Sequence, residues 1–325
     1  MAAPTGRKLT SALVSAAAGL ALTGCDSPGL NGAGASFPAA IYQHWFQEIA
    51  SQGTRVNYQS VGSGAGVRQF IAGTVDFGAS DVPMKAAEIA KVTRGVVQLP
   101  MTAGAIAVAY HNPGCELKLS QAQLADIFLG RIRDFKQLGC SAKPIKVVFR
   151  SDGSGTTANF TAHLAAISPI WKSGPGRGKA VTWPTGMGAK GNEGVAAQLN
   201  QMEGSIGYVE TAYVQGTLQA ASLSNASGDT VKPSTESAAA ALASIDLGAD
   251  LTGSNPNPRA GYPIVTFSWI LLYKNGSGAK LPVLQKTFSY TLSDAAQAKA
   301  STLGFVSLPA PVLSQSRRAL ADLKP

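Results

Sequence analysis

The chain has 325 residues, of which 45% are apolar and 14% are charged, and its formal net charge at pH 7 is +9. This length allows one large core or two modest ones, and this composition excludes a globally disordered protein. The basic residues are scattered rather than grouped in stripes with aromatic side chains, so we expect no nucleic-acid partner.

Residues 1–24 are predicted to be a secretory signal peptide rather than part of the fold. Arg7 and Lys8 form its positively charged region, and an uncharged stretch rich in Ala and Leu follows. This stretch is too short for a typical transmembrane helix. The run Leu-Thr-Gly-Cys ending at Cys25 resembles a bacterial lipobox, which implies cleavage before Cys25, its lipidation, and a short tether over 25–28. An ordinary signal peptide and an uncleaved anchor helix are the alternatives. We expect a lipid-anchored protein in the periplasm or on the outer face of a bacterial membrane.

The rest of the chain alternates between helical and strand-like patterns. Apolar residues at helical spacing predict helices after Pro38, near 67–71, after Ser120, and near 160–167, 195–202, 295–300 and 315–323. Alternating or continuous apolar runs predict strands at 56–61, 74–81, 106–110, 145–149, 206–209 and 265–273. Segments 222–237 and 253–261 are predicted loops. This alternation predicts an α/β fold with mostly parallel sheets.

Cysteine usage agrees with export. If Cys25 is lipidated, Cys115 and Cys140 remain, and an even number in an oxidising compartment predicts a disulfide. The bond would close a loop of about 25 residues. Two buried free thiols are the alternative. Because no third Cys lies nearby in the sequence, we expect no metal site.

Three Gly- and Ser-rich turns, at 32–37, 62–66 and 153–156, each precede a predicted helix. The first turn of a helix presents unpaired N–H groups and a partial positive charge, and glycines let an anion approach closely. One such turn is common, but three predict a site for a tetrahedral oxyanion if the fold brings them together. None has the spacing of a Walker A loop or of a dinucleotide-binding turn.

Two charged residues refine this hypothesis. Arg150 ends a predicted strand just before the third turn, where its guanidinium could clamp two oxygens of an anion; a surface ion pair is the alternative. Asp81 would repel a fully ionised anion but could accept a hydrogen bond from a protonated one, which would favour phosphate over sulfate. An Asx-turn or a helix N-cap ahead of Pro83 explains Asp81 equally well from residue chemistry alone.

Six runs, in one order along the mature chain, resemble the periplasmic phosphate-binding protein family of the high-affinity phosphate ABC transporter. They are Gly-Ala-Gly-Ala-Ser-Phe-Pro (32–38), Val-Asn-Tyr-Gln-Ser-Val-Gly-Ser-Gly (56–64), Thr-Val-Asp-Phe-Gly-Ala-Ser-Asp (74–81), Arg-Ser-Asp-Gly-Ser-Gly-Thr (150–156), Lys-Gly-Asn-Glu-Gly-Val-Ala-Ala (190–197) and Gly-Ser-Ile-Gly-Tyr-Val-Glu (204–210). The resemblance implies a type II periplasmic-binding-protein fold, in which two lobes with mixed sheets and flanking helices surround a hinged cleft. Lobe one would contain 29–103 plus 263–325, and lobe two 104–262.

The resemblance also implies a function and a ligand set. The protein would bind inorganic phosphate in the cleft, without a cofactor, and deliver it to the permease subunits of an ABC transporter. The implied phosphate contacts are Ser36, Phe37, Ser63, Asp81, Arg150, Ser154, Gly155 and Thr156, where Phe37 and Gly155 act through their backbone amides. Asp152 would hold Arg150 in place.

We expect a binding protein rather than an enzyme. Ser154 is not part of a nucleophile elbow, because Asp152 occupies the position that would need glycine. No clustered His, Asp and Glu set suggests metal-assisted phosphate hydrolysis, and His163 is expected to face solvent or to pack locally. The alternatives are a sensor or accessory binder of phosphate or another tetrahedral oxyanion, and a secreted phosphatase-like relative.

Overall fold

A computed structural model describes residues 1–3 and 29–325. The predicted lipidation site Cys25, the tether and most of the predicted signal peptide lie outside these residues. In the part of the chain that is described, no helix is long and apolar enough to cross a membrane.

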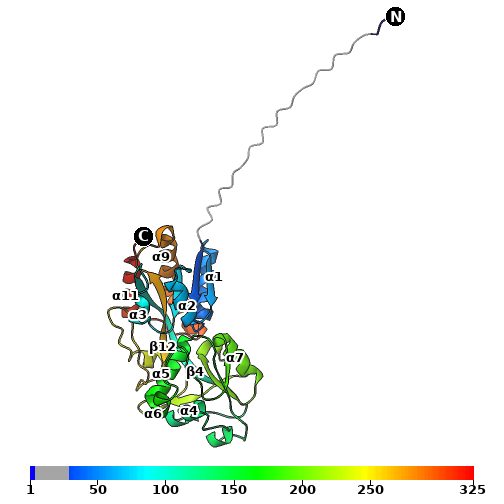
Figure 1. Cartoon of the computed structure of the whole chain (residues 1–325), viewed down its shortest axis with the longest axis vertical. Coiled ribbons are helices and arrows are strands. Elements are labelled where there is room, and N and C mark those ends of the chain that lie inside the picture. The colour runs from blue at the N-terminus through cyan, green and yellow to red at the C-terminus, as the bar shows by residue number, and fades with distance from the viewer. Residues whose placement is uncertain (4–28) are drawn as a thin grey trace.

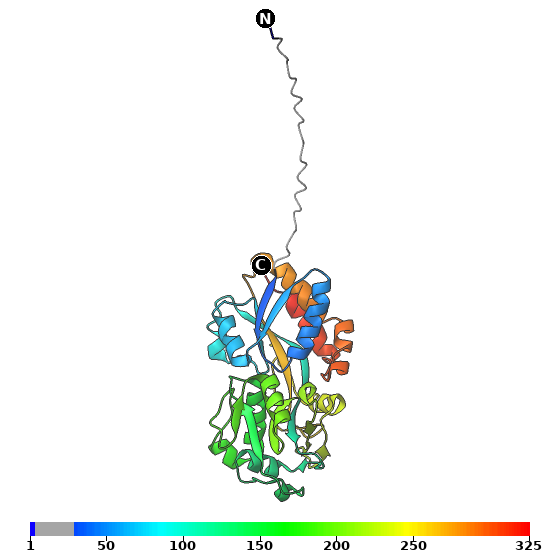
Figure 2. The same cartoon turned by 90° about the vertical axis from the view of Figure 1, so that its right-hand side faces the viewer.

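The described chain folds into two lobes stacked along the long axis of the molecule (Figures 1 and 2). Nine strands of residues 29–325 form one sheet that passes through both lobes, with β9 (Gln219–Ala220) beside the main path. The main path runs β2 (Val56–Ser60), β1 (Leu30–Gly34), β3 (Phe77–Ser80), β12 (Val265–Tyr273), β4 (Val96–His111), β8 (Ser205–Glu210), β6 (Lys146–Arg150) and β7 (Met187–Ala189). A small sheet in lobe two contains β11 (Thr230–Val231), β10 (Ser222–Ser224) and β5 (Lys118–Leu119).

Strand β4 joins the lobes. Its residues up to Ala105 pair with β12, and those from Ile106 onward pair with β8. The second connection between the lobes is the segment that leads into β12. It lies beside β4, because the Ile106 N–H donates to the Ile264 carbonyl at 2.8 Å. Two adjacent backbone crossings can act as a hinge, because few dihedral angles need to change for the lobes to move.

The sheet is mixed, so the prediction of mostly parallel sheets was wrong. Strands β1, β2 and β3 are parallel to one another, as are β6, β7 and β8. Strands β12 and β4, however, pair antiparallel with each other and with their neighbours. The reason is topological: the chain leaves lobe one through β4 and returns to it through β12 in the opposite direction.

Helices cover both lobes, and each predicted helix is present. Lobe one carries α1 (Ala39–Ser51), α2 (Ser63–Ile71), α3 (Ala86–Ile89), α9 (Leu281–Thr291), α10 (Asp294–Ala298) and α11 (Ala310–Ala321). Lobe two carries α4 (Gln121–Phe128), α5 (Gly155–Ile167), α6 (Pro169–Ser173), α7 (Gly191–Gln201) and α8 (Thr235–Leu242). Ser120 caps α4 as predicted, because its hydroxyl accepts from the Gln123 N–H at 3.2 Å. The predicted loop 222–237 was partly wrong, since it contains β10, β11 and the start of α8.

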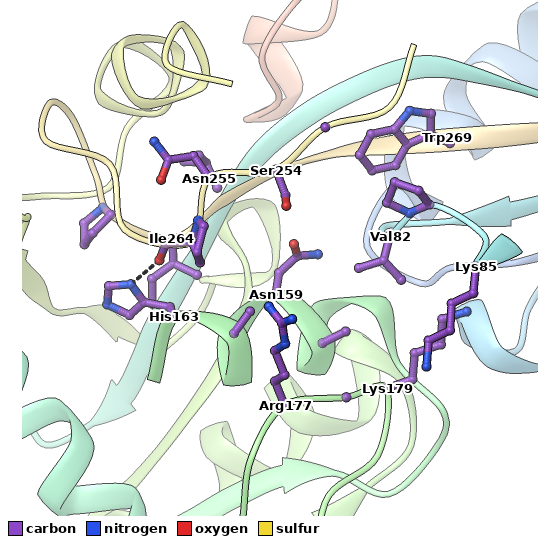
Figure 3. Close-up of a pocket in the computed structure, with 18 of the residues that line it drawn as sticks. Val82, Lys85, Asn159, His163, Arg177, Lys179, Ser254, Asn255, Ile264 and Trp269 are labelled. Atoms are coloured by element: carbon purple, nitrogen blue, oxygen red, sulfur yellow. Dashed lines mark hydrogen bonds between the residues drawn. The ribbon is translucent and has the colours of Figure 1, made fainter. Parts of the chain in front are cut away.

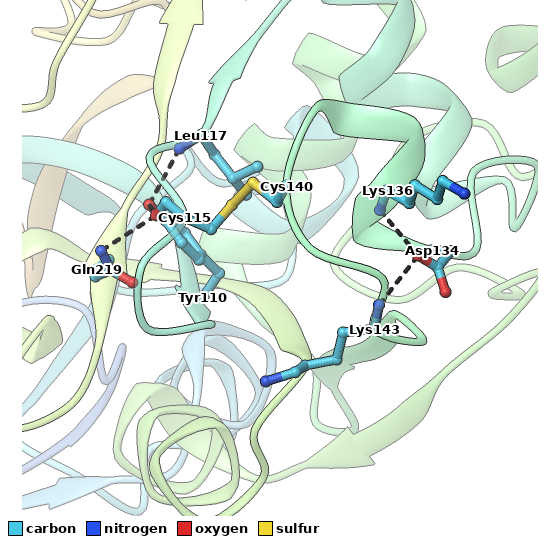
Figure 4. The surroundings of a disulfide bond; sticks show 8 residues. All are labelled: Tyr110, Cys115, Leu117, Asp134, Lys136, Cys140, Lys143 and Gln219. Atoms are coloured by element: carbon cyan, nitrogen blue, oxygen red, sulfur yellow. Dashed lines mark hydrogen bonds between the residues drawn. A yellow bond between two sulfur atoms is a disulfide. The ribbon is translucent and has the colours of Figure 1, made fainter.

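The predicted disulfide is present (Figure 4). Cys115 follows β4 and Cys140 follows the short 3₁₀ turn Phe135–Leu138, and their Cα atoms are 5.5 Å apart. The Tyr110 hydroxyl donates to the Cys115 carbonyl at 2.8 Å. The disulfide therefore connects the end of β4 to a loop-rich part of lobe two.

Candidate functional site

The three Gly- and Ser-rich turns meet at the contact between the lobes. The Gly155 N–H of lobe two donates to the Ser63 hydroxyl of lobe one at 3.1 Å, and the Gly64 N–H donates to the Gly153 carbonyl at 2.7 Å. A Cβ atom at Gly155 would lie 2.5 Å from the Ser63 Oγ and 2.8 Å from the Asp81 Cβ. Only glycine fits at position 155 while the lobes are in contact.

The first turn reaches lobe two through Asn192, at the start of α7. The backbone N–H and side-chain Nδ2 of Asn192 both donate to the Ser36 Oγ, at 3.0 and 2.9 Å. The same Nδ2 donates to the Thr156 Oγ1 at 3.2 Å. Because these hydroxyl oxygens accept hydrogen bonds, their own protons remain available for an anion, and the accepted bonds polarise them.

Arg150 ends β6 and is held in a fixed orientation. Its Nε donates to Asp152 Oδ1 at 2.7 Å and its Nη2 to Asp152 Oδ2 at 2.5 Å. Its Nη1 lies 3.4 Å from the Thr156 Oγ1, and its backbone N–H donates to the Tyr208 hydroxyl. The Arg150 side chain is 1% exposed, so the alternative of a surface ion pair is wrong. Burial alone would raise the pKa of Asp152, but the hydrogen bond and charge of Arg150 outweigh it and lower that pKa.

Asp81 is buried between the lobes. Its Oδ1 accepts from the Ser268 hydroxyl at 2.9 Å, and its Oδ2 lies 3.4 Å from the Ser63 Oγ. Lys85 occupies the N-cap position of α3, so Asp81 does not cap that helix. Burial raises the pKa of Asp81 to about 7, although the Ser268 hydrogen bond and the Arg150 charge act in the opposite direction. Near neutral pH this carboxyl group therefore exists both as a hydrogen-bond donor and as an acceptor.

The remaining candidate residues lie in the same region. Ser154 is buried and caps α5, because its hydroxyl accepts from the Thr157 N–H at 3.0 Å. The Phe37 ring packs in lobe one against Phe305, with ring centroids 6.2 Å apart. His163 packs locally, as expected, and its Nδ1 lies 2.7 Å from the Pro256 carbonyl. The structure brings all the candidate phosphate-binding positions together, and their contact with phosphate stays a prediction.

Sequence reasoning missed three buried residues of this site. Asn192 lies within the 190–197 run, but the sequence alone suggested no role for it. Ser268 is a buried polar residue in the apolar run 265–273, and this contrast is the signal that could have identified it. Glu210 is fully buried, and its backbone N–H donates to the Asn192 Oδ1 at 2.9 Å. Burial raises the pKa of Glu210 well above its ordinary value, although hydrogen bonds from the Ala212 and Thr211 backbone N–H groups act in the opposite direction. Among residues 1–3 and 29–325, no group of three or more His, Cys, Asp or Glu side chains could hold a metal ion.

Comparison with known proteins identifies the family. Residues 15–296 match the family model of the PBP superfamily domain. The phosphate-binding protein PstS of Pasteurella multocida (strain Pm70) is 41% identical over 306 residues, which cover 88% of each chain. This chain belongs to the PstS family of phosphate-binding proteins. Its similarity to the PstS of Haemophilus influenzae is comparable, at 42% identity over 88% of this chain and 90% of the relative.

Solved structures agree with a PstS-type fold. A phosphate-binding protein from Stenotrophomonas maltophilia superposes with a TM-score of 0.71 at 21% identity, over 90% of this chain and 93% of that one. A high-affinity periplasmic phosphate-binding protein bound with phosphate at pH 8.5 gives a TM-score of 0.75 at 21% identity, over the same shares. The predicted two-lobed periplasmic-binding-protein fold is thereby confirmed.

Proposed function

We propose that this PstS-family protein binds inorganic phosphate between its lobes and delivers it to the permease subunits of an ABC importer. The observation that carries the proposal is the buried Arg150 guanidinium, which Asp152 fixes and whose Nη1 lies 3.4 Å from the Thr156 Oγ1. Thr156 in turn shares the Asn192 Nδ2 donor with Ser36 of lobe one. The relatives at 41% and 42% identity are named phosphate-binding proteins. In this proposal lobe one comprises 29–103 plus 263–325 and lobe two 104–262.

Each group at the site has a role in this proposal. Arg150 supplies the charge, and the hydroxyl and amide donors surround the remaining phosphate oxygens. These donors are Ser36, Phe37, Ser63, Ser154, Gly155 and Thr156. Asp81 accepts a hydrogen bond from the proton that phosphate keeps near neutral pH, whereas fully ionised sulfate has none to offer. The protein acts by binding rather than catalysis, as its relatives' names describe. A lipid on Cys25 anchors it in the periplasm or on the outer face of a bacterial membrane.

Calorimetry with phosphate and sulfate tests the binding step. We expect one phosphate per chain and, at pH 9, where Asp81 is ionised, sulfate binding weaker by at least about 100-fold, because the ionised carboxylate opposes a fully ionised anion. Equal affinity for the two anions would contradict the proposal. A chromogenic phosphate ester tests the enzyme alternative, since turnover that follows the protein through purification would show catalysis.

Uptake of radiolabelled phosphate tests the delivery step. Cells that lack the chain should regain high-affinity uptake when the wild-type protein is restored but not when Arg150→Lys is restored. A protein that binds phosphate in vitro yet leaves uptake unchanged would instead be a sensor or an accessory binder.

A further inference from the structure

A cavity of about 470 Å³ lies beside the candidate phosphate site (Figure 3). Its walls come from the segment after β3, from α5, from 177–179, from the loop 253–256 and from the start of β12. Asn159 separates the two sites, because it lines the cavity while its Nδ2 donates to the Asp81 carbonyl at 2.7 Å. None of the candidate phosphate contacts lines the cavity.

The cavity carries surplus positive charge. Lys85, Arg177 and Lys179 line it, and Glu88 is the acidic residue among the lining residues. Glu88 is already engaged: one carboxylate oxygen accepts from the Lys85 backbone N–H at 2.7 Å, and the other lies 3.6 Å from the Lys179 Nζ. Within residues 29–325, neither Lys85 nor Arg177 has an ion-pair partner. Burial lowers the pKa of the lining His163 to about 4, so this residue is neutral and adds no charge.

The rest of the lining is mainly apolar, with a polar edge. Val82, Ile264, Val265 and Trp269 contribute apolar surface. Trp269 is held in place by the hydrogen bond from its Nε1 to the Leu251 carbonyl at 2.8 Å. Figure 3 shows Ser254 and Asn255 along the side of the cavity opposite Arg177. A few polar and charged groups on an apolar lining of this volume are typical of sites for small organic ligands.

We propose that this cavity is a second ligand site, which takes a small organic anion with an apolar body, such as an aromatic carboxylate. The anionic group would pair with Lys85 and Arg177, which come from different lobes, and the apolar body would lie against the start of β12. Since both lobes contribute to the walls, the ligand contacts both of them only while they are closed. Such a ligand stabilises the closed form, so by linkage it raises the affinity for phosphate.

Calorimetry with naphthalene-2-carboxylate, on full-length mature protein already saturated with phosphate, tests the proposal. We expect one binding site, with binding at least about tenfold weaker for the uncharged naphthalene-2-carboxamide, because only the carboxylate pairs with the free cations. The double substitution Lys85→Gln/Arg177→Gln should weaken carboxylate binding by a similar factor, and Ala162→Phe, which fills the cavity from α5, should abolish it. Lys136→Gln, an exposed cation elsewhere in lobe two, is the matched control. Phosphate titration shows whether each variant is folded. If Ala162→Phe does not fold, the Lys85→Gln/Arg177→Gln variant still decides the outcome.

Three results would overturn the proposal. They are no binding of the carboxylate to the phosphate-saturated protein, equal binding of the carboxamide, and binding unchanged by the cavity variants. With phosphate-free protein, release of the bound probe by added phosphate would also overturn the proposal, because the probe would then occupy the phosphate site. Saturating carboxylate should lower the phosphate dissociation constant of the wild-type protein, and a rise would refute the coupling. Failure of phosphate binding itself would be seen separately in the phosphate titration.

Discussion

Asn192 donates two hydrogen bonds to one atom of the opposite lobe, the Ser36 hydroxyl oxygen, at 3.0 and 2.9 Å. Both residues are buried, and their contact does not involve Arg150 or Asp81. This residue of α7 therefore connects lobe closure to the orientation of a donor proposed to contact phosphate.

Replacing Asn192 with Ala should weaken phosphate binding roughly tenfold, because Ser36 and Thr156 lose a buried donor and the Glu210 N–H loses its acceptor. Calorimetry measures the affinity, and thermal unfolding should show a loss of stability as well. Gln201→Ala, on the exposed end of the same helix, is the control. An unchanged affinity in Asn192→Ala would remove this residue from the site.

At pH 9, where wild-type Asp81 is ionised, Asp81→Asn should reduce the preference for phosphate over sulfate by at least about tenfold, mainly by improving sulfate binding, since the neutral amide no longer repels sulfate. The Ser268 hydroxyl still finds an acceptor in the amide oxygen, so the fold should be retained. Competition titrations with both anions measure the preference. If the variant discriminates as the wild-type protein does, selectivity arises elsewhere in the site.

Asp81 also predicts a pH dependence of stability. Its pKa is about 7 in the folded protein against an ordinary value of 3.8, so between these values the folded state binds more protons than the unfolded state. The stabilisation is fully present below about pH 4 and is lost as the pH rises towards 7, at up to about 1.4 kcal/mol per pH unit. In thermal unfolding of phosphate-free protein, the melting temperature of Asp81→Asn relative to that of the wild type should therefore rise as the pH is raised from acidic to neutral. Parallel curves for the two proteins would contradict the assignment.

Arg150→Lys should weaken phosphate binding by roughly 100-fold, because a lysine cannot reproduce the planar fork held by Asp152. Asp152→Asn keeps the shape but weakens the hold on the guanidinium, so a smaller loss is expected. Lys146→Gln, an exposed change at the other end of β6, is the control. Equal affinities for the Arg150→Lys and Lys146→Gln proteins would show that the fixed guanidinium is not needed.

Removing the disulfide with Cys115→Ser/Cys140→Ser should lower the free energy of unfolding by about 3 kcal/mol. Phosphate affinity should stay within roughly twofold, because none of the candidate contacts lies in the bridged loop. Denaturant unfolding measures the loss, and a reductant should destabilise the wild-type protein but not the double variant. A large change in affinity would show that the loop supports the site.

Regular spacing made much of this fold predictable. The apolar run 265–273 matches β12, and the period from Ile41 to Ile49 lies within α1. The two- and three-residue strands of lobe two are too short to show a period. The first half of β4 was also missed, because Pro100 interrupts the run and a strand buried on both faces need not alternate.

The site was less accessible from sequence than the fold. Gly and Ser residues identified the three turns in the sequence. Their convergence depends on how the lobes pack, and only the family resemblance predicted it. Asn192 acts on Ser36 across 156 residues of sequence, and no local pattern reveals such a contact. The assignment of phosphate contacts to these positions remains a prediction.

The placement of β12 has a consequence for the order of folding. This strand lies between β3 and β4 in the sheet, yet it follows nearly all of lobe two in the chain. The Ser268–Asp81 hydrogen bond spans 187 residues, and contacts this distant in sequence form slowly because a long loop must close first. Until β12 arrives, β3 and β4 present unpaired edges, which are the features that promote aggregation of partly folded chains. A chain truncated before residue 265 should therefore aggregate rather than yield a soluble lobe one.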